Sequence, residues 1–215
     1  MQGYIVDIKA VKDDDLIVTI ICENELITSY RFYGARHSNI NIGYKIDFEL
    51  ETTKSTISRL KDVIQLGFPW ILNNQKMYAW QRYLKLFYVH LKELHELEPF
   101  YFFLLENLVS KIEKQNVYRA IIESYLSILE HEGRLHTDFE CLICEVEINS
   151  DLSIVRGFLP VHKSCIRGKV FDYLKIKELF FTKKTINLND DEVENLFEIL
   201  LLGLWNRVNI NLFLF

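Results

Sequence analysis

The stretch GYKIDFELE, residues 43–51, decides the fold of the first part of the chain. Apolar side chains alternate there with charged ones, and a period of two is typical of a half-buried β-strand. The stretches GYIVDIKAV, DLIVTIIC and ELITSYRFYG before it, and ISRLKDVIQLG after it, have the composition of further strands, with turn-forming residues between them. Five short strands in about 65 residues predict a small barrel of the OB-fold type, over residues 1–67.

The sequence GFPW, residues 67–70, marks a change from strands to helices. Pro69 disfavours helix at the residue before it, and from Trp70 onward the apolar residues recur with a helical period. Helices are expected after Trp70, after Pro99, around residues 121–129, and in the stretches FDYLKIKELFF and NDDEVENLFEILLLGL. The last stretch begins with the pattern of a capping box, Asn189 and Glu192. The predicted class is therefore α+β, a five-stranded OB-fold barrel at 1–67 followed by an α-helical domain at 68–215.

The composition limits the kinds of protein that the chain can be. Of its 215 residues, 49% are hydrophobic, so packed cores are expected and a disordered chain is not. The apolar C-terminal stretch is interrupted by Glu198 and Arg207, and we expect a docked helix and tail there rather than a membrane span. The first residues lack the pattern of a secretory signal, so we expect a cytoplasmic protein whose cysteines are reduced.

Three of the four cysteines fall in the stretch CLICEVEINSDLSIVRGFLPVHKSC, residues 141–165. The spacing Cys141-x2-Cys144-x17-His162-x2-Cys165 places two short-range ligand pairs on either side of a loop, which is the pattern of zinc ribbons and knuckles. The alternative is three buried cysteines and a surface histidine. Cys22 fits that alternative better, because a free cysteine in an apolar run such as LIVTIIC acts as a small hydrophobe.

A zinc ion at these four residues is expected to be structural. A catalytic zinc usually has three protein ligands and an open position for water, whereas four ligands close the site. A zinc deaminase also needs His-x-Glu upstream of Pro-Cys-x-x-Cys, and the sequence has neither pattern; a nucleotide-binding P-loop does not occur either. The sequence therefore predicts a non-enzymatic protein whose zinc module at 141–165 holds a loop-rich segment together.

The distribution of charge indicates one candidate surface for nucleic acid. The chain has 25 basic and 30 acidic residues, whereas nucleic-acid-binding proteins usually carry a basic patch. Between Arg156 and Lys184, however, eight residues are basic and two are acidic. We expect Lys163, Arg167 and Lys169, beside the metal ligands, to contact phosphate. The alternative is that this stretch is an ordinary solvated face.

The end of the third predicted strand combines cations with aromatic rings. Alternation places Ser29, Arg31 and Tyr33 on one face, which we expect to be solvent-exposed, and Tyr30 and Phe32 on the other, which we expect to be core. OB-folds bind single strands by combining attraction to the backbone with base stacking. The candidates for DNA binding on the barrel are therefore Arg31, Tyr33, Arg36 and His37. The acidic turn at Asp13–Asp15 is expected to avoid DNA, and one alternative is that it is only a solvated hairpin.

Several short motifs together resemble the RecO family of recombination and repair mediators. They are MQGYIV at the start, YRFYGAR at the end of the third strand, EHEGRL before CLIC, and RGFLPVHKSC. The resemblance spans nearly the whole chain, and it implies an N-terminal OB-fold followed by a helical domain with a zinc module. It also implies binding to single- and double-stranded DNA, strand annealing, and partnership with RecR and single-stranded-DNA-binding protein in loading RecA. A cytoplasmic, nucleoid-associated location without a membrane partner is implied as well.

One departure from that family concerns the ligands. Its zinc-bearing members usually offer four cysteines, whereas position 162 here is histidine, and a site of three cysteines and one histidine is chemically sound.

Two other classes of function are open from the sequence. A protein adaptor without DNA contact is compatible with the acidic net charge and the aromatic-rich helical domain. A zinc hydrolase or deaminase would need an open metal position and a general base, which the spacing does not supply.

Overall fold

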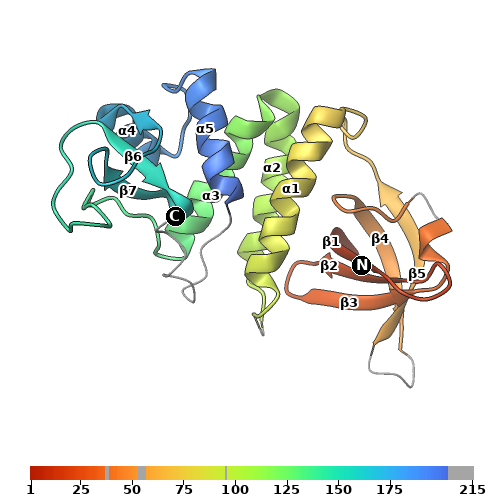
Figure 1. Cartoon of the computed structure of the whole chain (residues 1–215). Coiled ribbons are helices and arrows are strands. Elements are labelled where there is room, and N and C mark those ends of the chain that lie inside the picture. The colour runs from red at the N-terminus through yellow and green to blue at the C-terminus, as the bar shows by residue number, and fades with distance from the viewer. Residues whose placement is uncertain (37–38, 53–56, 95, 203–215) are drawn as a thin grey trace. The chain divides into compact units, whose positions relative to one another are not determined.

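The computed structural model describes residues 1–36, 39–52, 57–94 and 96–202, and these belong to two compact units, Met1–Lys114 and Gln115–Phe215 (Figure 1). The first unit begins with five strands, β1 (Gln2–Ala10), β2 (Leu16–Ile21), β3 (Leu26–Arg31), β4 (Lys45–Glu51) and β5 (Ser58–Leu66). They form a closed barrel in the order β1-β2-β3-β5-β4, in which β4 pairs with β1 and the pair β3 and β5 is parallel. The predicted five-stranded OB-fold barrel is confirmed.

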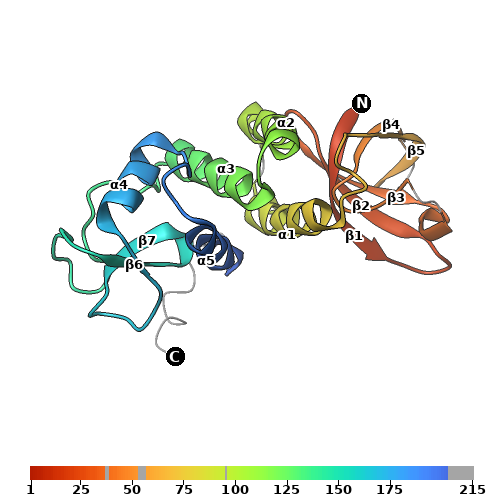
Figure 2. The same ribbon diagram turned by 90° about the horizontal axis from the view of Figure 1, so that it is seen from above.

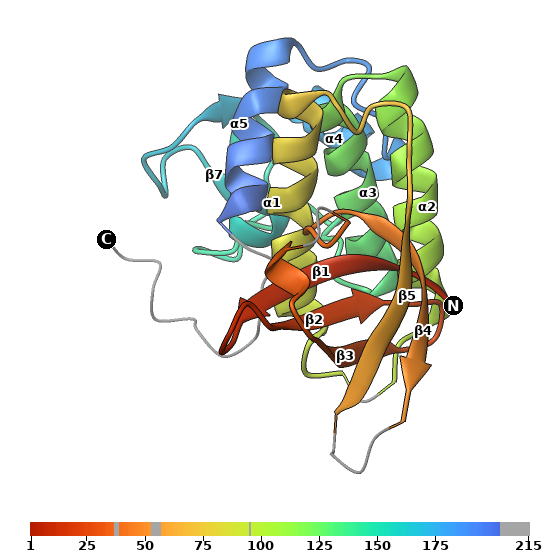
Figure 3. The same ribbon diagram turned by 90° about the vertical axis from the view of Figure 1, so that its right-hand side faces the viewer.

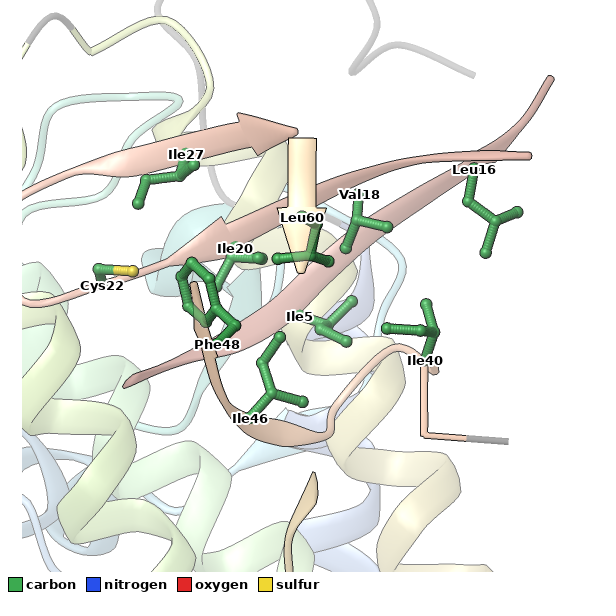
Figure 4. Close-up of a cluster of buried hydrophobic side chains, with 10 residues drawn as sticks. All are labelled: Ile5, Leu16, Val18, Ile20, Cys22, Ile27, Ile40, Ile46, Phe48 and Leu60. Carbon is green, nitrogen blue, oxygen red and sulfur yellow. The ribbon is translucent and has the colours of Figure 1, made fainter. Parts of the chain in front are cut away.

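The interior of the barrel is filled mainly by aliphatic side chains from all five strands (Figure 4). Within the stretch 43–51, Ile46 and Phe48 are buried as the alternation predicts. Cys22 belongs to the same buried cluster, and burial raises the pKa of its thiol to about 12. It is therefore a core residue, as expected. Each fully buried valine, leucine, isoleucine or phenylalanine side chain stabilises the barrel by about 1.5–3 kcal/mol relative to an exposed one.

Two helices of the first unit, α1 (Asn74–Leu91) and α2 (Pro99–Lys114), lie on the same side of the barrel (Figure 3). The indole N–H of Trp80 on α1 donates to the carbonyl of Gly43 at 2.9 Å. Gly43 has a φ of +91°, and a Cβ there would lie 2.8 Å from the Trp80 ring, so a larger residue does not fit.

A second contact joins the barrel to α2. Glu106 accepts a hydrogen bond from the Tyr4 hydroxyl at 2.7 Å and forms an ion pair with the Lys45 ammonium at 2.8 Å. Burial, and then the neighbouring Glu106 carboxylate, raise the pKa of Tyr4 far above its usual value. The barrel and these two helices therefore share one packed interface.

The second unit contains α3 (Val117–His131), α4 (Tyr173–Thr182) and α5 (Asp190–Leu201). Asn189 and Glu192 form the predicted capping box at the start of α5. The apolar face of α5 packs on α3, where the rings of Tyr118 and Phe197 have their centroids 4.5 Å apart. Gly133, with a φ of +64°, follows the end of α3 as predicted.

A small antiparallel sheet in the second unit was not expected from the sequence. It consists of β6 (Leu152–Val155), β7 (Leu159–His162) and β8 (Val170–Phe171), in the order β7-β6-β8, and β6 lies beside α5 (Figure 2). A short 3-10 segment, Arg156–Phe158, connects β6 to β7, and its Gly157 has a φ of 78°. Strands of two to four residues are too short to show a period of two in the sequence.

The compact units divide after Lys114, whereas the predicted division at residue 67 follows the change from strands to helices. That domain division remains a prediction. Among the residues described, no helix has both the length and the apolar character that crossing a membrane requires. The C-terminal tail, for which a docked conformation was predicted, lies outside the described residues.

Candidate functional site

Four side chains of the second unit converge as the spacing predicts. The ligand atoms of Cys141, Cys144, His162 and Cys165 all lie within 4.8 Å of one another. The sulfur atoms of Cys144 and Cys165 are 3.8 Å apart. A tetrahedral ion with zinc–sulfur bonds of about 2.3 Å holds two sulfurs about 3.8 Å apart. The separation of these two sulfurs therefore fits a tetrahedral zinc ion.

The first pair of ligands is positioned by a tight turn, which we call the first knuckle, residues 140–147. The backbone N–H of Cys141 donates to the carbonyl of Val146 at 2.9 Å, and the N–H of Glu145 donates to the carbonyl of Cys141 at 2.8 Å. An isolated β-bridge between Glu140 and Glu147 closes the base of the turn. These bonds hold the two sulfurs on one side of the turn.

The second pair of ligands comes from the end of β7, in a segment that we call the second knuckle, residues 162–169. β7 ends at His162, and the N–H of Cys165 donates to the carbonyl of His162 at 3.0 Å. The pairing of β7 with β6 therefore fixes where this pair of ligands starts.

The ring of His162 presents one nitrogen to the other ligands and one to the backbone. Its Nδ1 lies 3.3 Å from the sulfur of Cys144, and its Nε2 lies 3.3 Å from the carbonyl oxygen of Glu147. A backbone carbonyl that accepts the Nε2 proton leaves Nδ1 as the metal-binding nitrogen, which is a common arrangement for histidine ligands.

The environment of Cys141 favours a thiolate. Burial opposes its ionisation, but the N–H groups of Cys144, His162 and Ile143 outweigh that effect and lower the pKa of Cys141 to about 6. In the absence of metal, burial and the neighbouring sulfurs raise the pKa of Cys165 to about 11. The cluster can therefore bind one metal ion, and its four protein donors match a structural zinc site.

The basic stretch that follows the first knuckle divides into paired and unpaired side chains. Lys175, Lys183 and Lys184 lie within 4.0 Å of the carboxylates of Glu192, Glu130 and Glu123 respectively. Lys163, Arg167 and Lys169 are exposed on the second knuckle. Lys163 lies 4.0 Å from Asp151, and neither Arg167 nor Lys169 has a partner within the residues described.

A second candidate surface, the aromatic–arginine surface, lies on the barrel and consists of Phe32, Tyr33, Arg36 and Arg59. The two rings are 43% and 53% exposed respectively. The guanidinium carbon of Arg59 is 4.0 Å from the centroid of Phe32, and that of Arg36 is 5.1 Å from the centroid of Tyr33. Each aromatic ring thus has a cation on its face.

The acidic turn before β2 supports this surface, so the alternative of a merely solvated hairpin is wrong. Asp15 accepts a hydrogen bond from the Tyr30 hydroxyl at 2.5 Å and one from the Tyr33 backbone N–H at 2.6 Å. The Tyr30 hydroxyl first, and then the Tyr33 N–H, hold the pKa of Asp15 below its usual value. Asp14 forms an ion pair with Arg36 at 2.7 Å. Exposed ion pairs contribute little energy, so a phosphate can replace Asp14 at low cost.

The prediction of which side chains of the third strand face the core and which face solvent was wrong. Ser29 is fully buried, and Arg31 is half-buried and donates to the carbonyl of Leu60 at 2.9 Å. Phe32, predicted to be core, is exposed, and Tyr30 is half-buried. Phe32 and Tyr33 follow the last residue of β3, so strand alternation does not govern them.

Arg59 was not predicted as a candidate, although it is a cation in the fifth predicted strand and the parallel pairing places it opposite Tyr30. His37, which was predicted, lies outside the described residues. DNA binding by any of these residues remains a prediction.

The comparisons with known proteins identify the N-terminal domain. A family model described as RecO N terminal matches residues 1–71, which include all five strands of the barrel. The comparison with curated proteins gave no match. The match agrees with the resemblance that the motifs indicated and with the closed barrel of the structure. Residues 1–71 are thus similar to the N-terminal domain of the RecO family.

Proposed function

We propose that this chain is a non-enzymatic mediator of DNA repair and homologous recombination. It binds and anneals DNA, and it helps to load the RecA recombinase on single strands that single-stranded-DNA-binding protein has coated. The match of residues 1–71 to the RecO N-terminal model supports a role in DNA recombination and repair. The proposed partners are single- and double-stranded DNA, RecR and single-stranded-DNA-binding protein, and the proposed location is the cytoplasm, in association with the nucleoid.

The aromatic–arginine surface is the observation that carries this proposal. Exposed rings with cations on their faces suit single-stranded DNA, because every base offers a face for stacking and every nucleotide carries a phosphate. Arg59 is also bonded to Glu51 at 3.4 Å. Arg36 and Arg59 are thus held by weak ion pairs, with Asp14 and Glu51 respectively, and a phosphate can replace these carboxylates.

The second knuckle is proposed as an additional contact with phosphate. Arg167 and Lys169 are exposed and have no carboxylate partner in the described part of the chain. The metal ion is proposed to be zinc and to have a structural role, because four protein donors leave no open position for a reacting water.

The test is fluorescence anisotropy of a labelled single strand, measured with zinc-loaded protein at two salt concentrations. We expect affinity to fall steeply with salt and to depend little on sequence. Replacing Arg36 and Arg59 by alanine should weaken binding and reduce the salt slope by about two, one for each cation that no longer meets a phosphate. Replacing the exposed Lys85 of α1 and the exposed Lys92 just after that helix by alanine removes the same charge and should change the slope little.

Annealing and loading are separate readouts of the same proposal. We expect the protein to speed the pairing of complementary strands coated with single-stranded-DNA-binding protein, and to need RecR for loading RecA. Absence of binding to single strands at low salt, with zinc present, would contradict the proposal. That result would favour the alternative of a zinc-stabilised protein adaptor without DNA contact.

A further inference from the structure

The first knuckle exposes an apolar surface beside the metal centre. Leu142, Ile143 and Val146 are 45%, 55% and 58% exposed. The N–H of Leu142 donates to the carbonyl of Pro160 at 3.1 Å, so the backbone of the turn is attached to β7. Because the turn is also closed by its own hydrogen bonds, these side chains cannot rotate into the core as a group. Exposed apolar clusters of this kind mark interaction sites.

The charges around this surface are acidic. From residue 135 to residue 155 the chain has five acidic residues and no lysine or arginine. The acidic residues are all exposed: Asp138, Glu140, Glu145, Glu147 and Asp151. From residue 156 to residue 169 it has four basic residues and no acidic one. The first knuckle therefore repels phosphate, whereas the second attracts it.

The segment that leaves the first knuckle lines a hollow of about 460 Å³. Asn149, Ser150 and Asp151 form part of its lining, together with residues at the start of α4. Two carboxylates, Asp151 and Asp172, line the hollow, and Lys163 is the single cation among its lining residues. The exposed side chain of Leu174 adds an apolar wall. A hollow with this lining suits the long apolar stem and the charged end of a lysine or arginine side chain.

We infer that the first knuckle and this hollow form a docking site for a segment of a protein partner in which lysine or arginine residues flank leucine-like side chains. The apolar residues of the partner would cover Leu142, Ile143 and Val146, and its cations would face the surrounding carboxylates. An apolar centre with a charged rim is the usual anatomy of a protein interface. This site does not depend on the proposed binding of DNA, because its charge has the opposite sign to the one that DNA requires.

The experiment uses the full zinc-loaded chain and two labelled peptides of equal charge. One peptide alternates lysine with leucine, and the other alternates lysine with serine. We expect the leucine peptide to bind about tenfold more tightly in fluorescence anisotropy, which is about 1.4 kcal/mol, because a few residues at the centre of an interface carry most of its binding energy. The variant L142S/I143S should remove that difference, while its zinc content, measured by mass spectrometry, stays at the wild-type level.

Charge variants separate this site from the DNA surface. E145K/E147K should weaken the binding of both peptides, and R167E/K169E should leave peptide binding unchanged. Equal affinity for the two peptides, or a preference that survives L142S/I143S, would overturn the inference. Two further outcomes would also overturn it in favour of another occupant. A loss of single-strand binding in L142S/I143S would assign the surface to DNA, and a self-association of wild-type protein that L142S/I143S abolishes would assign it to a second copy of the chain.

Discussion

Replacing Phe32 by alanine is the sharpest test of the barrel surface. The ring is 43% exposed and contacts the Arg59 guanidinium, whose carbon lies 4.0 Å from its centroid. An exposed cation–π contact is worth about 0.5–1 kcal/mol, so we expect the free energy of unfolding to fall by no more than about 1 kcal/mol. One base stacked on an aromatic ring is worth about 1–3 kcal/mol, so affinity for single strands should fall by about 5- to 150-fold.

The assay is anisotropy of a labelled single strand at two salt concentrations. Because Phe32→Ala removes no charge, the salt slope should stay at its wild-type value while the affinity falls. Tyr78 of α1 offers a matched control, since its ring is 62% exposed and lies 5.4 Å from the guanidinium carbon of Arg82. Tyr78→Ala should bind DNA like the wild type. Equal affinities for Phe32→Ala and Tyr78→Ala would refute the stacking argument.

Three other substitutions test the metal centre, the acidic turn and the barrel–helix interface. Cys141→Ser should lower the bound zinc and the melting temperature, because a structural zinc contributes on the order of 10 kcal/mol to folding; unchanged zinc content by mass spectrometry would contradict this. Asp15 has a lowered pKa when folded, so its contribution to stability is complete above about pH 4 and is lost as the pH falls through that lowered value. In urea unfolding below pH 4, the free energy of unfolding of the wild type should therefore fall more steeply with falling pH than that of Asp15→Asn. Parallel dependence on pH in the two proteins would argue against this role of Asp15. Glu106→Ala leaves the Lys45 ammonium without its carboxylate partner and should lower the free energy of unfolding by about 1–3 kcal/mol. The exposed Glu113→Ala on the same helix should leave the free energy of unfolding unchanged.

The barrel was predictable because alternation reports directly on which side chains are buried. Ile46 and Phe48 show this, since both lie in a strand whose neighbours of opposite phase are charged. Which residues of β3 point into the barrel was not predictable in the same way. Its inward position 29 is a serine, which donates to the carbonyl of Val18 at 3.4 Å instead of contributing apolar surface. Polarity alone therefore assigned that residue to the wrong face.

The metal ligands were predictable because a short spacing between paired ligands reflects one tight turn, which is a local property of the chain. The aromatic–arginine surface depends on contacts between segments distant in sequence. Arg59 reaches Phe32 only because β3 and β5 pair in parallel, and no local pattern reveals that pairing. The sheet that supports the ligands was missed for a related reason, because β6 and β7 are four residues each and gain their stability from pairing.

The contacts that Gly43 and Lys45 make with α1 and α2 affect how the chain can be divided in experiments. The match to the family model ends at residue 71, three residues before α1 begins. A fragment cut at that limit would lack Trp80 and Glu106 and would expose the side of the barrel that they cover. A truncation that retains both residues has to extend through α2, to Lys114. The segment that matches the family model is thus shorter than the first compact unit, and fragments for isolated study should follow the compact unit.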